Sequence, residues 1–331
     1  MAIKGVNLGG WLLLEKWMTP KIFEGTDAID EWTFMQTRGA TKKLEAHRDT
    51  FITENDFIWL KTHGIDAVRI PVGYWVLEGD CVYKSALKHL DNAMKWAKKH
   101  KLKVLIDLHG APGSQNGHHH SGQTGRSDWH KSRKYRNQTV DILVDLVKRY
   151  RDNPYFWGIE LLNEPKYGFM GLKLMWFYRK AYFAIKKVAP SGLHIVFHDA
   201  FMPYLLSGVF GRFTKLPVVM DVHFYQFTDW FRRWRSFNGY FKLLRRREKR
   251  LGLYSLMQPV IIGEWSVVIS GEILKTKGVL SEAEAFKLHG KLQQEAYENT
   301  LGWFYWTYKT EGRGIWNFRS LVEDGVVTLI N

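Results

Sequence analysis

The sequence is poor in cysteine and contains no long apolar run. Its 331 residues include one cysteine, Cys81, so no disulfide can form within the chain, which fits a reducing compartment. No apolar run approaches the roughly 20 residues that a membrane-spanning helix needs. The chain also lacks the basic start, apolar stretch and small-residue cleavage site of a secretory signal. We therefore expect a cytoplasmic protein, peripheral to a membrane at most, or a secreted one if a leader has been removed.

Linkers and low-complexity tracts are also absent, and we expect residues 1–331 to form a single domain. Strand-like apolar runs instead alternate with helix-like periodic segments about eight times. The strand patterns lie at residues 3–8, 65–71, 102–109, 156–165, 193–198, 218–224, 259–265 and 301–307. The helical patterns include residues 54–63, 87–99, 139–150, 172–188, 242–251 and 281–297.

This alternation decides the predicted fold class. Strands that alternate with helices predict parallel β/α units, and eight units predict an α/β fold, the closed (β/α)8 TIM barrel. The alternative is an open doubly wound sheet, but no Gly-x-Gly-x-x-Gly follows the first strand pattern to support it.

Polar side chains follow several of these strand patterns. In a TIM barrel the active site lies at the carboxyl ends of the strands, and the residues found there are Arg69, His109, Asn163, Glu164, His223, Tyr225, Glu264 and Trp306. Singly, each could be a packed or ion-paired residue without a function. Two glutamates that end strand patterns far apart in the sequence are harder to dismiss, because a barrel brings Glu164 and Glu264 to one rim.

Paired carboxylates perform one well-known reaction, the hydrolysis of a glycosidic bond. One carboxyl group protonates the leaving oxygen and later activates water, while the other attacks the anomeric carbon. Two nearby carboxylates resist ionising together, which separates their pKa values, and Arg69 would keep the nucleophile ionised. The alternative is a metal site with His109, His223 and the two glutamates as ligands. No His-Glu-x-x-His or similar local pair supports that alternative.

Seven sequence blocks occur in order along almost the whole chain. They are Gly5-Val-Asn-Leu-Gly-Gly-Trp-Leu-Leu-Leu-Glu15, Val68-Arg-Ile-Pro-Val-Gly-Tyr-Trp75, Asp107-Leu-His-Gly-Ala-Pro-Gly-Ser-Gln-Asn-Gly117, Leu162-Asn-Glu-Pro165, His223-Phe-Tyr225, Gly263-Glu-Trp265 and Gly302-Trp-Phe-Tyr-Trp306. Together they resemble the signature blocks of glycoside hydrolase family 5, and most of all its exo-β-1,3-glucanase branch. The Asn-Glu-Pro block alone is moderately specific, whereas the third block and the ordered set are strong.

The resemblance implies a retaining mechanism, with Glu164 as the acid/base and Glu264 as the nucleophile. It implies that Asn163 hydrogen-bonds the sugar 2-hydroxyl and that Arg69 and Tyr225 hold Glu264. The other implied contacts are His109 and His223 lining the sugar subsite, Trp306 as a platform under the ring, and Glu15 on the outer hydroxyls of the terminal glucose. The implied substrate is a β-linked oligo- or polysaccharide, and no metal or organic cofactor is implied.

The loop after Gly117 departs from this family. Where the family pattern implies an aromatic residue and an amide that shape the pocket, this chain has three histidines at residues 118–120. Either they form a solvated loop, or His118 and His120 belong to a subsite with contacts of its own. Specificity for β-1,3-glucan therefore does not follow from the resemblance.

A second departure is the basic, aromatic segment at residues 229–250. It holds nine Lys and Arg against two acids, about half of the net charge of +15. Its apolar residues follow a helical stripe, formed by Trp230, Trp234, Phe237, Phe241 and Leu244. Either the stripe packs on the barrel, or the segment contacts an anionic membrane surface or an acidic glycan. We expect no nucleic acid as a partner, because no recognised binding motif accompanies the charge.

We therefore expect a retaining β-glycosidase that hydrolyses β-glucosidic bonds, acting on chain ends as a β-1,3-glucanase or β-glucosidase. Two alternatives stay open. A site of this kind can pass the glycosyl group to another sugar, which would make the protein a transglycosylase on β-glucans or on lipid-linked or acidic saccharides. A barrel that kept the pocket without activity would be a carbohydrate- or membrane-binding protein, which the complete set of acid, nucleophile and supporting residues disfavours.

Overall fold

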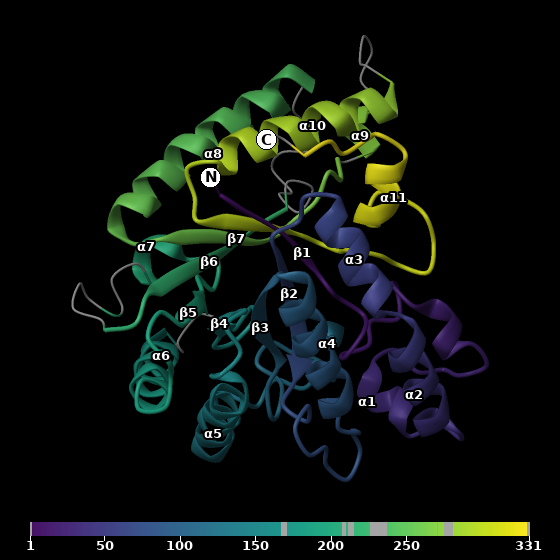
Figure 1. Cartoon of the computed structure of the whole chain (residues 1–331), viewed down its shortest axis with the longest axis vertical. Coiled ribbons are helices and arrows are strands. Elements are labelled where there is room, and N and C mark those ends of the chain that lie inside the picture. Colours follow the sequence, from purple (N-terminus) through teal and green to yellow (C-terminus); the bar gives the residue numbers. More distant parts are fainter. Residues whose placement is uncertain are drawn as a thin grey trace.

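Eight parallel strands form a closed barrel in the computed structural model (Figure 1). The structure describes residues 2–166, 171–206, 210, 215–225, 237–269, 271–274 and 281–329. The strands are β1 (Ile3–Asn7), β2 (Ala67–Gly73), β3 (Lys103–Gly110), β4 (Phe156–Glu160), β5 (His194–His198), β6 (Val218–Phe224), β7 (Val260–Trp265) and β8 (Gly302–Tyr305). Because β8 pairs with β1, for example Phe304 with Gly5, the expected (β/α)8 TIM barrel is confirmed.

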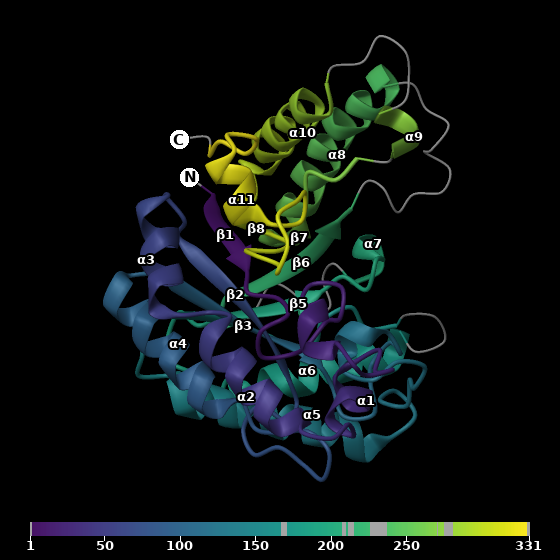
Figure 2. The ribbon, with the colours of Figure 1, turned by 90° about the vertical axis from the view of Figure 1, so that its right-hand side faces the viewer.

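Helices surround the strands on the outside of the barrel (Figure 2). The longer ones are α2 (Ala40–Thr50), α3 (Glu54–Thr62), α4 (Leu87–His100), α5 (Arg133–Tyr150), α6 (Gly171–Ile185), α8 (Phe237–Met257) and α10 (Glu282–Tyr297). Shorter segments are η1 (Pro20–Phe23), α1 (Glu31–Met35), η2 (His119–Ser121), α7 (Pro203–Leu206), α9 (Gly271–Leu274) and α11 (Phe318–Glu323). In the described part of the chain, no helix combines the length and the apolar character that crossing a membrane requires.

Alternate residues of each strand face the barrel interior, and this alternation places the site. Near the amino ends of the strands, one interior layer is apolar and consists of Ile3, Ala67, Leu105, Val196, Val219, Ile261 and Phe304. Two residues further along the same faces, the interior becomes polar, with Arg69 after Ala67 and Asp107 after Leu105. The interior of the barrel is therefore apolar near the amino ends of the strands and charged near their carboxyl ends.

The opposite faces of the strands pack against the helices. In α4 the buried apolar residues are Leu90, Ala93, Met94 and Ala97, the three- and four-residue spacing of one helix face. They join a continuous core with strand residues such as Val68 and Val104. Burying a leucine or methionine side chain of this kind contributes about 1.5–3 kcal/mol, so the helix layer holds the barrel closed.

Some helix boundaries differ from the predicted ones. Helix α5 begins at Arg133 rather than at residue 139, because the Ser132 side chain accepts a hydrogen bond from the Tyr135 amide and caps an earlier turn. Helix α8 extends past both predicted ends and includes Gly239. The predicted start of α10 is confirmed, since the Ser281 hydroxyl accepts a hydrogen bond from the amide of Glu284.

One buried histidine gives the fold a testable pH dependence. The Nε2 atom of His47 donates to the Gly10 carbonyl at 2.8 Å, and burial lowers its pKa to about 4. The unfolded chain binds a proton near pH 6.5, so wild type should lose about 2 kcal/mol of stability through this group between pH 7 and pH 5. His47→Gln keeps a donor for Gly10 but does not titrate. The unfolding free energy of the variant minus that of wild type, measured by urea denaturation, should therefore increase by about 2 kcal/mol from pH 7 to pH 5.

The comparison uses the difference between the two proteins because other buried acids and histidines titrate in both. A difference in unfolding free energy that stays constant from pH 7 to pH 5 would contradict the assignment of His47 as a neutral, buried donor.

Candidate active site

A cavity of about 1030 Å³ opens at the carboxyl ends of the strands. The predicted site residues that line it are Glu15, His109, His118, His120, Asn163, Glu164, His223, Tyr225, Glu264 and Trp306. The remaining predicted residue, Arg69, is fully buried beside the cavity and contacts Glu264 and Asn163. The structure thus brings the whole predicted set together, with residues contributed by loops and strand ends all around the barrel.

Arg69 connects several strands from inside the barrel. Its guanidinium nitrogens lie within 3.2 Å of oxygen atoms on Asn7, Asp107, Glu160, Asn163 and Glu264. Burial acts to lower its pKa, but the surrounding carboxylates raise that pKa well above the usual value, so Arg69 stays charged. A guanidinium presents its donors in one fixed plane. Arg69 therefore fixes the relative positions of the strand ends that carry these acceptors.

An irregularity in β7 turns Glu264 toward the cavity. The pairing of β7 with β8 shifts register between Ile262 and Trp265, which interrupts the alternation of inward and outward side chains. Gly263 is required here, because a Cβ atom at this position would lie 1.9 Å from Oδ2 of Asp221. Without the shift, Glu264 would share the outward face of Ile262.

Two donors hold the Glu264 carboxylate. Arg69 donates to its Oε1 at 3.2 Å, and the Tyr225 hydroxyl donates to its Oε2 at 2.8 Å. Burial raises the pKa of Glu264 to about 8, helped by the charge of Glu164 and opposed by His223, Arg69 and Tyr225. Because part of this increase comes from Glu164, a proton on Glu164 favours the ionised form of Glu264.

Glu164 lies just beyond the end of β4 rather than at the tip of the strand that the sequence suggests. The strand pairing ends at Glu160, although the backbone N–H of Asn163 still donates to the Leu108 carbonyl at 3.0 Å. Glu164 itself has a φ of 40°, a left-handed conformation that is uncommon outside glycine. This turn places its carboxylate in the cavity, where Oε1 lies 2.7 Å from Nδ1 of His223.

One nitrogen of the His223 imidazole contacts both glutamates. This Nδ1 atom is 2.7 Å from Oε1 of Glu164 and 3.5 Å from Oε2 of Glu264. The two oxygens can therefore be no farther apart than the sum of these distances, 6.2 Å. Retaining glycosidases place their carboxyl groups about 5–5.5 Å apart, and inverting ones about 6.5–9.5 Å. The arrangement therefore fits a retaining site.

The imidazole of His223 carries a proton next to Glu164. Its Nε2 atom lies 3.4 Å from Oδ2 of Asp221. Burial acts to lower the pKa of His223, but Glu264 and Asp221 raise it well above the usual value. For Glu164, burial acts to raise the pKa, and the hydrogen bond and charge of His223 outweigh burial and lower it. One proton thus rests on His223, a short transfer away from Glu164.

Trp306 and His109 form one wall of the cavity. Their ring planes differ by 9° with centroids 5.5 Å apart. Burial and the charge of Arg69 lower the pKa of His109 to about 3, so the ring is neutral. Its Nδ1 donates to Asp107 at 2.6 Å, which leaves Nε2 to accept from the Asn163 amide at 3.3 Å. The orientation of the Asn163 amide group is therefore fixed from both sides.

The three histidines at residues 118–120 belong to the cavity wall. Nε2 of His119 lies 3.3 Å from Glu15, and Nε2 of His120 lies 3.4 Å from Glu164. His118 stacks on His120 with centroids 5.4 Å apart. The hydrogen bond with Glu15 raises the pKa of His119, whereas burial lowers that of His120 to about 4. Of the two interpretations of this loop, the structure favours a subsite over a solvated segment.

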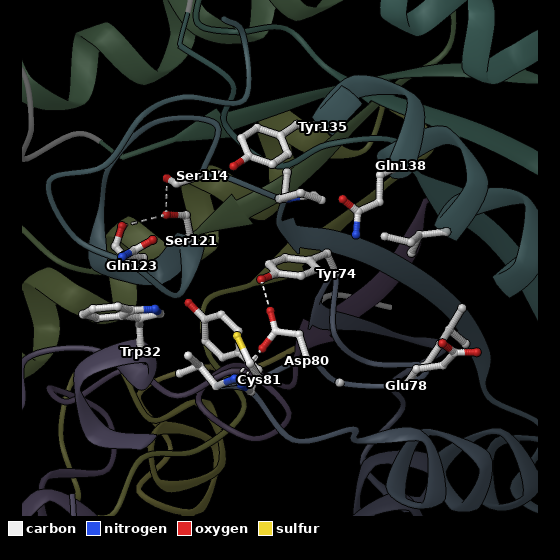
Figure 3. A pocket seen from close by; sticks show the side chains of 18 of the residues that line it. Trp32, Tyr74, Glu78, Asp80, Cys81, Ser114, Ser121, Gln123, Tyr135 and Gln138 are labelled. Atoms are coloured by element: carbon white, nitrogen blue, oxygen red, sulfur yellow. Dashed lines mark hydrogen bonds between the residues drawn. The ribbon is translucent and has the colours of Figure 1, made fainter. Parts of the chain in front are cut away.

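A second hollow, of about 460 Å³, lies behind this loop (Figure 3). The segments after β2 and β3 line it together with α5, and its aromatic walls include Trp32, Tyr74 and Tyr135. Ser121 lies at its edge and shares a 2.6 Å hydrogen bond with Ser114. Neither of the two glutamates lines this hollow. Residues around the hollow hold the end of the histidine loop, since the Tyr83 hydroxyl also donates to the Gly122 carbonyl at 3.1 Å.

Sequence reasoning missed the polar residues that support the site inside the barrel. They are Asn7, Asp107, Glu160, His198 and Asp221, all buried. A signal was present in the two-residue spacing of inward positions, since Asp107 precedes His109 and Asp221 precedes His223 by two residues.

The metal alternative is less well supported by the geometry. Next to the cavity, two groups of possible ligands have their atoms within 4.8 Å of one another, one of them Glu164 with His198 and His223, the other Glu160 with Asp221 and His223. Both groups depend on His223, whose two ring nitrogens already contact carboxylates. His109, which the metal alternative needs, belongs to neither group and donates to Asp107. These residues form a proton-sharing network instead.

The closed barrel and the pair of glutamates at one rim fit a retaining glycoside hydrolase. The family profile described as Cellulase (glycosyl hydrolase family 5) matches residues 26–312. The chain is 34% identical to "Probable glucan 1,3-beta-glucosidase A" of Emericella nidulans, over 98% of this chain and 89% of the relative. It is 32% identical to "Glucan 1,3-beta-glucosidase 1" of Schizosaccharomyces pombe, over 98% and 87%. The chain therefore belongs to glycoside hydrolase family 5 and is a retaining β-glycosidase.

Solved structures show the same fold. A rutinosidase from Aspergillus niger superposes with a TM-score of 0.82 at 22% identity, covering 98% of this chain and 97% of that one. Cel5A of Thermotoga maritima superposes with a TM-score of 0.62 at 16% identity, covering 95% and 91%.

Removal of the Arg69 charge should destabilise the whole protein. In Arg69→Met the carboxylates around it would lose their buried partner, and we expect a loss of about 3–5 kcal/mol in the free energy of unfolding. Arg69→Lys keeps the charge but not the planar set of donors, so its loss should be smaller. Urea denaturation of both variants measures this order, and an Arg69→Met variant as stable as wild type would contradict the role of Arg69.

Proposed function

We propose that this protein is an exo-acting retaining β-glucosidase, formed by one domain over residues 1–331, that removes glucose from the ends of β-1,3-glucan or from small β-glucosides. The observation that carries the proposal is that Glu164 and Glu264 approach the same nitrogen of one imidazole at the cavity. Their separation suits protonation and attack at the same glycosidic bond.

In the first step Glu264 attacks the anomeric carbon while Glu164 protonates the leaving oxygen. The proton comes from the Glu164–His223 hydrogen bond, which explains how Glu164 can act as the acid although His223 lowers its pKa. As Glu164 takes up the proton, His223 becomes neutral, and Arg69 and Tyr225 stabilise the negative charge on Glu264. The bond to the leaving group breaks as the bond to Glu264 forms, which gives an α-linked glycosyl-enzyme.

In the second step a water molecule takes the place of the leaving group. Glu164, now a carboxylate, accepts a proton from this water, and the water oxygen displaces Glu264 from the anomeric carbon. The product has the β configuration again. Asn163 supports both steps, because Arg69 and His109 orient its amide beside the glutamates, where a sugar 2-hydroxyl would lie.

The wall residues support a subsite for one terminal glucose. We propose Trp306 as the platform under the ring, with His109 and His223 along its edge and Glu15 on the outer hydroxyls. Glu15 is 3% exposed and contacts His119, so it marks an end of the cavity and favours exo-action. His118 and His120 would shape the same subsite.

The choice of β-1,3-glucan rests on the relatives. Proteins that align with almost the whole chain carry the name glucan 1,3-beta-glucosidase, and their coverage includes both glutamates. This supports the proposed linkage.

Contact of residues 229–250 with an anionic membrane surface or an acidic glycan stays a proposal. Trp230 and Trp234 lie outside the described residues. Of the predicted stripe, the structure describes the side chain of Leu244, which is buried and favours packing on the barrel at this end. Exposed Lys242 and Arg246 leave positive charge available on α8. The cytoplasmic location also stays a proposal, and the exposed thiol of Cys81 fits a reducing compartment.

Chemical rescue should separate the roles of the two glutamates. Glu264→Ala should lose at least 1,000-fold in hydrolysis, because no nucleophile remains, on the order expected for such residues. Azide that enters the space should form an α-glycosyl azide. With a dinitrophenyl glucoside, Glu164→Ala should still form the glycosyl-enzyme and give a β-glycosyl azide. Near-normal hydrolysis in either variant, or the opposite pair of products, would contradict the assignment.

Product analysis should test exo-action and linkage. With β-1,3-linked glucose oligosaccharides of increasing length, we expect glucose as the first product at every length, in its β form, resolved by size and by NMR. Larger fragments as first products would contradict exo-action, and faster release from β-1,4-linked oligosaccharides would contradict the linkage. At high acceptor concentration, longer products would identify transglycosylation.

A further inference from the structure

An apolar surface borders the catalytic cavity on the side of β5. Residues 201–205, which we refer to as the apolar shelf, line the same cavity as the two glutamates. Phe201, Tyr204 and Leu205 are 60%, 61% and 54% exposed. Contiguous exposed apolar side chains mark binding surfaces more often than chance positions. The shelf therefore needs an explanation that the subsite for glucose does not provide.

The backbone holds the shelf in a fixed turn. Ala200 and Phe201 both have positive φ, 49° and 60°, a strained conformation for non-glycine residues that is typical of functional sites. The Asp199 side chain accepts a hydrogen bond from the Phe201 amide at 2.8 Å, and His198 accepts one from the Ala200 amide at 2.9 Å. Both acceptors are buried, so the turn is built into the barrel.

The shelf is also close to the proposed acid/base. The Phe201 ring packs edge-on against His198 with centroids 5.1 Å apart, and His198 packs against His223 at 4.3 Å. His223 in turn contacts Glu164. Helix α7, which carries Tyr204 and Leu205, lies beside β5 and β6 in Figure 2.

The barrel places the shelf opposite the groups that suit a sugar ring. In the strand order from β1 to β8, β5 lies across the barrel from β1. Glu15 follows β1 and Trp306 follows β8, whereas Glu164 follows β4, next to the shelf. With glucose against Trp306 and Glu15, the glycosidic oxygen must point to Glu164 to receive its proton. The group beyond this oxygen, the aglycone, then extends over the shelf.

The chemistry of the shelf suits an alkyl group better than a second sugar. Of its five side chains, Phe201, Met202, Pro203, Tyr204 and Leu205, that of tyrosine is the one with a hydroxyl group. A second glucose would lose hydrogen bonds to water here with few partners in return. An alkyl chain loses none and gains burial of its methylenes.

We propose that the apolar shelf binds an apolar aglycone, so that the substrates of this enzyme include β-glucosides of hydrophobic alcohols. The inference rests on the proposed function, because it needs hydrolysis by Glu164 and Glu264. It gives the enzyme two unlike subsites, a polar one for glucose and an apolar one for the leaving group.

The test is the dependence of kcat/KM on the length of the alkyl chain. We expect kcat/KM to rise about twofold per methylene from methyl to hexyl β-glucoside, or roughly thirtyfold in all, since a shelf open on one side buries about half of each methylene. All substrates are used below their critical micelle concentrations, so that their aggregation does not affect the measured rates. Hexyl β-glucoside should also exceed the β-1,3-linked disaccharide of glucose.

Two variants and a matched control identify the surface. Phe201→Asn removes the ring but tolerates positive φ, and Leu205→Ser removes a second side chain of the shelf. Each should lower kcat/KM for hexyl β-glucoside by fivefold or more and leave methyl β-glucoside within twofold of wild type. Leu256→Ser changes an equally apolar leucine, 83% exposed near the end of α8 and outside the cavity lining, and should change neither substrate.

The outcomes separate this inference from the proposed function. If no β-glucoside is hydrolysed, the proposed function fails and this inference with it. If hydrolysis occurs with the same kcat/KM for methyl and hexyl β-glucoside, the shelf proposal fails and the proposed function stands. If Phe201→Asn impairs the disaccharide and spares hexyl β-glucoside, the shelf is a glucan subsite and the apolar aglycone is overturned.

Discussion

The buried charge of Arg69 is the constraint on which the rest of the site depends. A guanidinium inside a barrel must have acceptors in its plane, because breaking a buried ion pair costs about 3–5 kcal/mol. The acceptors come from separate strands, among them Asn7 on β1, Glu160 on β4 and Glu264 on β7. The same interactions that order the strand ends therefore also hold Glu264 in place and favour its ionised form.

A second consequence concerns the proton that the reaction needs. The carboxyl groups of Glu164 and Glu264 lie 2.7 Å and 3.5 Å from the same nitrogen of His223, at the cavity. His223 holds the proton in the free enzyme, next to Glu164, and the charges of His223 and Arg69 oppose the burial that raises the pKa of Glu264. In the proposed mechanism His223 thus acts on both glutamates, while the proposed apolar shelf and glucose subsite select the groups on either side of the bond.

The fold and the two glutamates could be predicted because each depends on a local pattern. Apolar strands alternate with amphipathic helices, and two of the strand patterns end in carboxylates. The exact position of the site could not be predicted in this way. The register shift that turns Glu264 inward and the left-handed turn at Glu164 arise from packing against neighbouring strands. Glu160 and Asp221 lie inside apolar strands, and their role becomes visible when the barrel surrounds Arg69 and His223. The apolar shelf had no periodic pattern, since its exposure depends on a turn held by buried side chains.

The most direct test of the central claim is the trapping of the covalent intermediate. In a 2-deoxy-2-fluoro β-glucoside the fluorine slows both steps, while a good leaving group speeds up the first one. The second step then limits the reaction, so the glycosyl-enzyme accumulates. The account predicts one sugar per protein, located on Glu264 by mass spectrometry of the proteolysed chain. A sugar located on Glu164, or continued hydrolysis of β-glucosides by a protein that never forms the adduct, would contradict it.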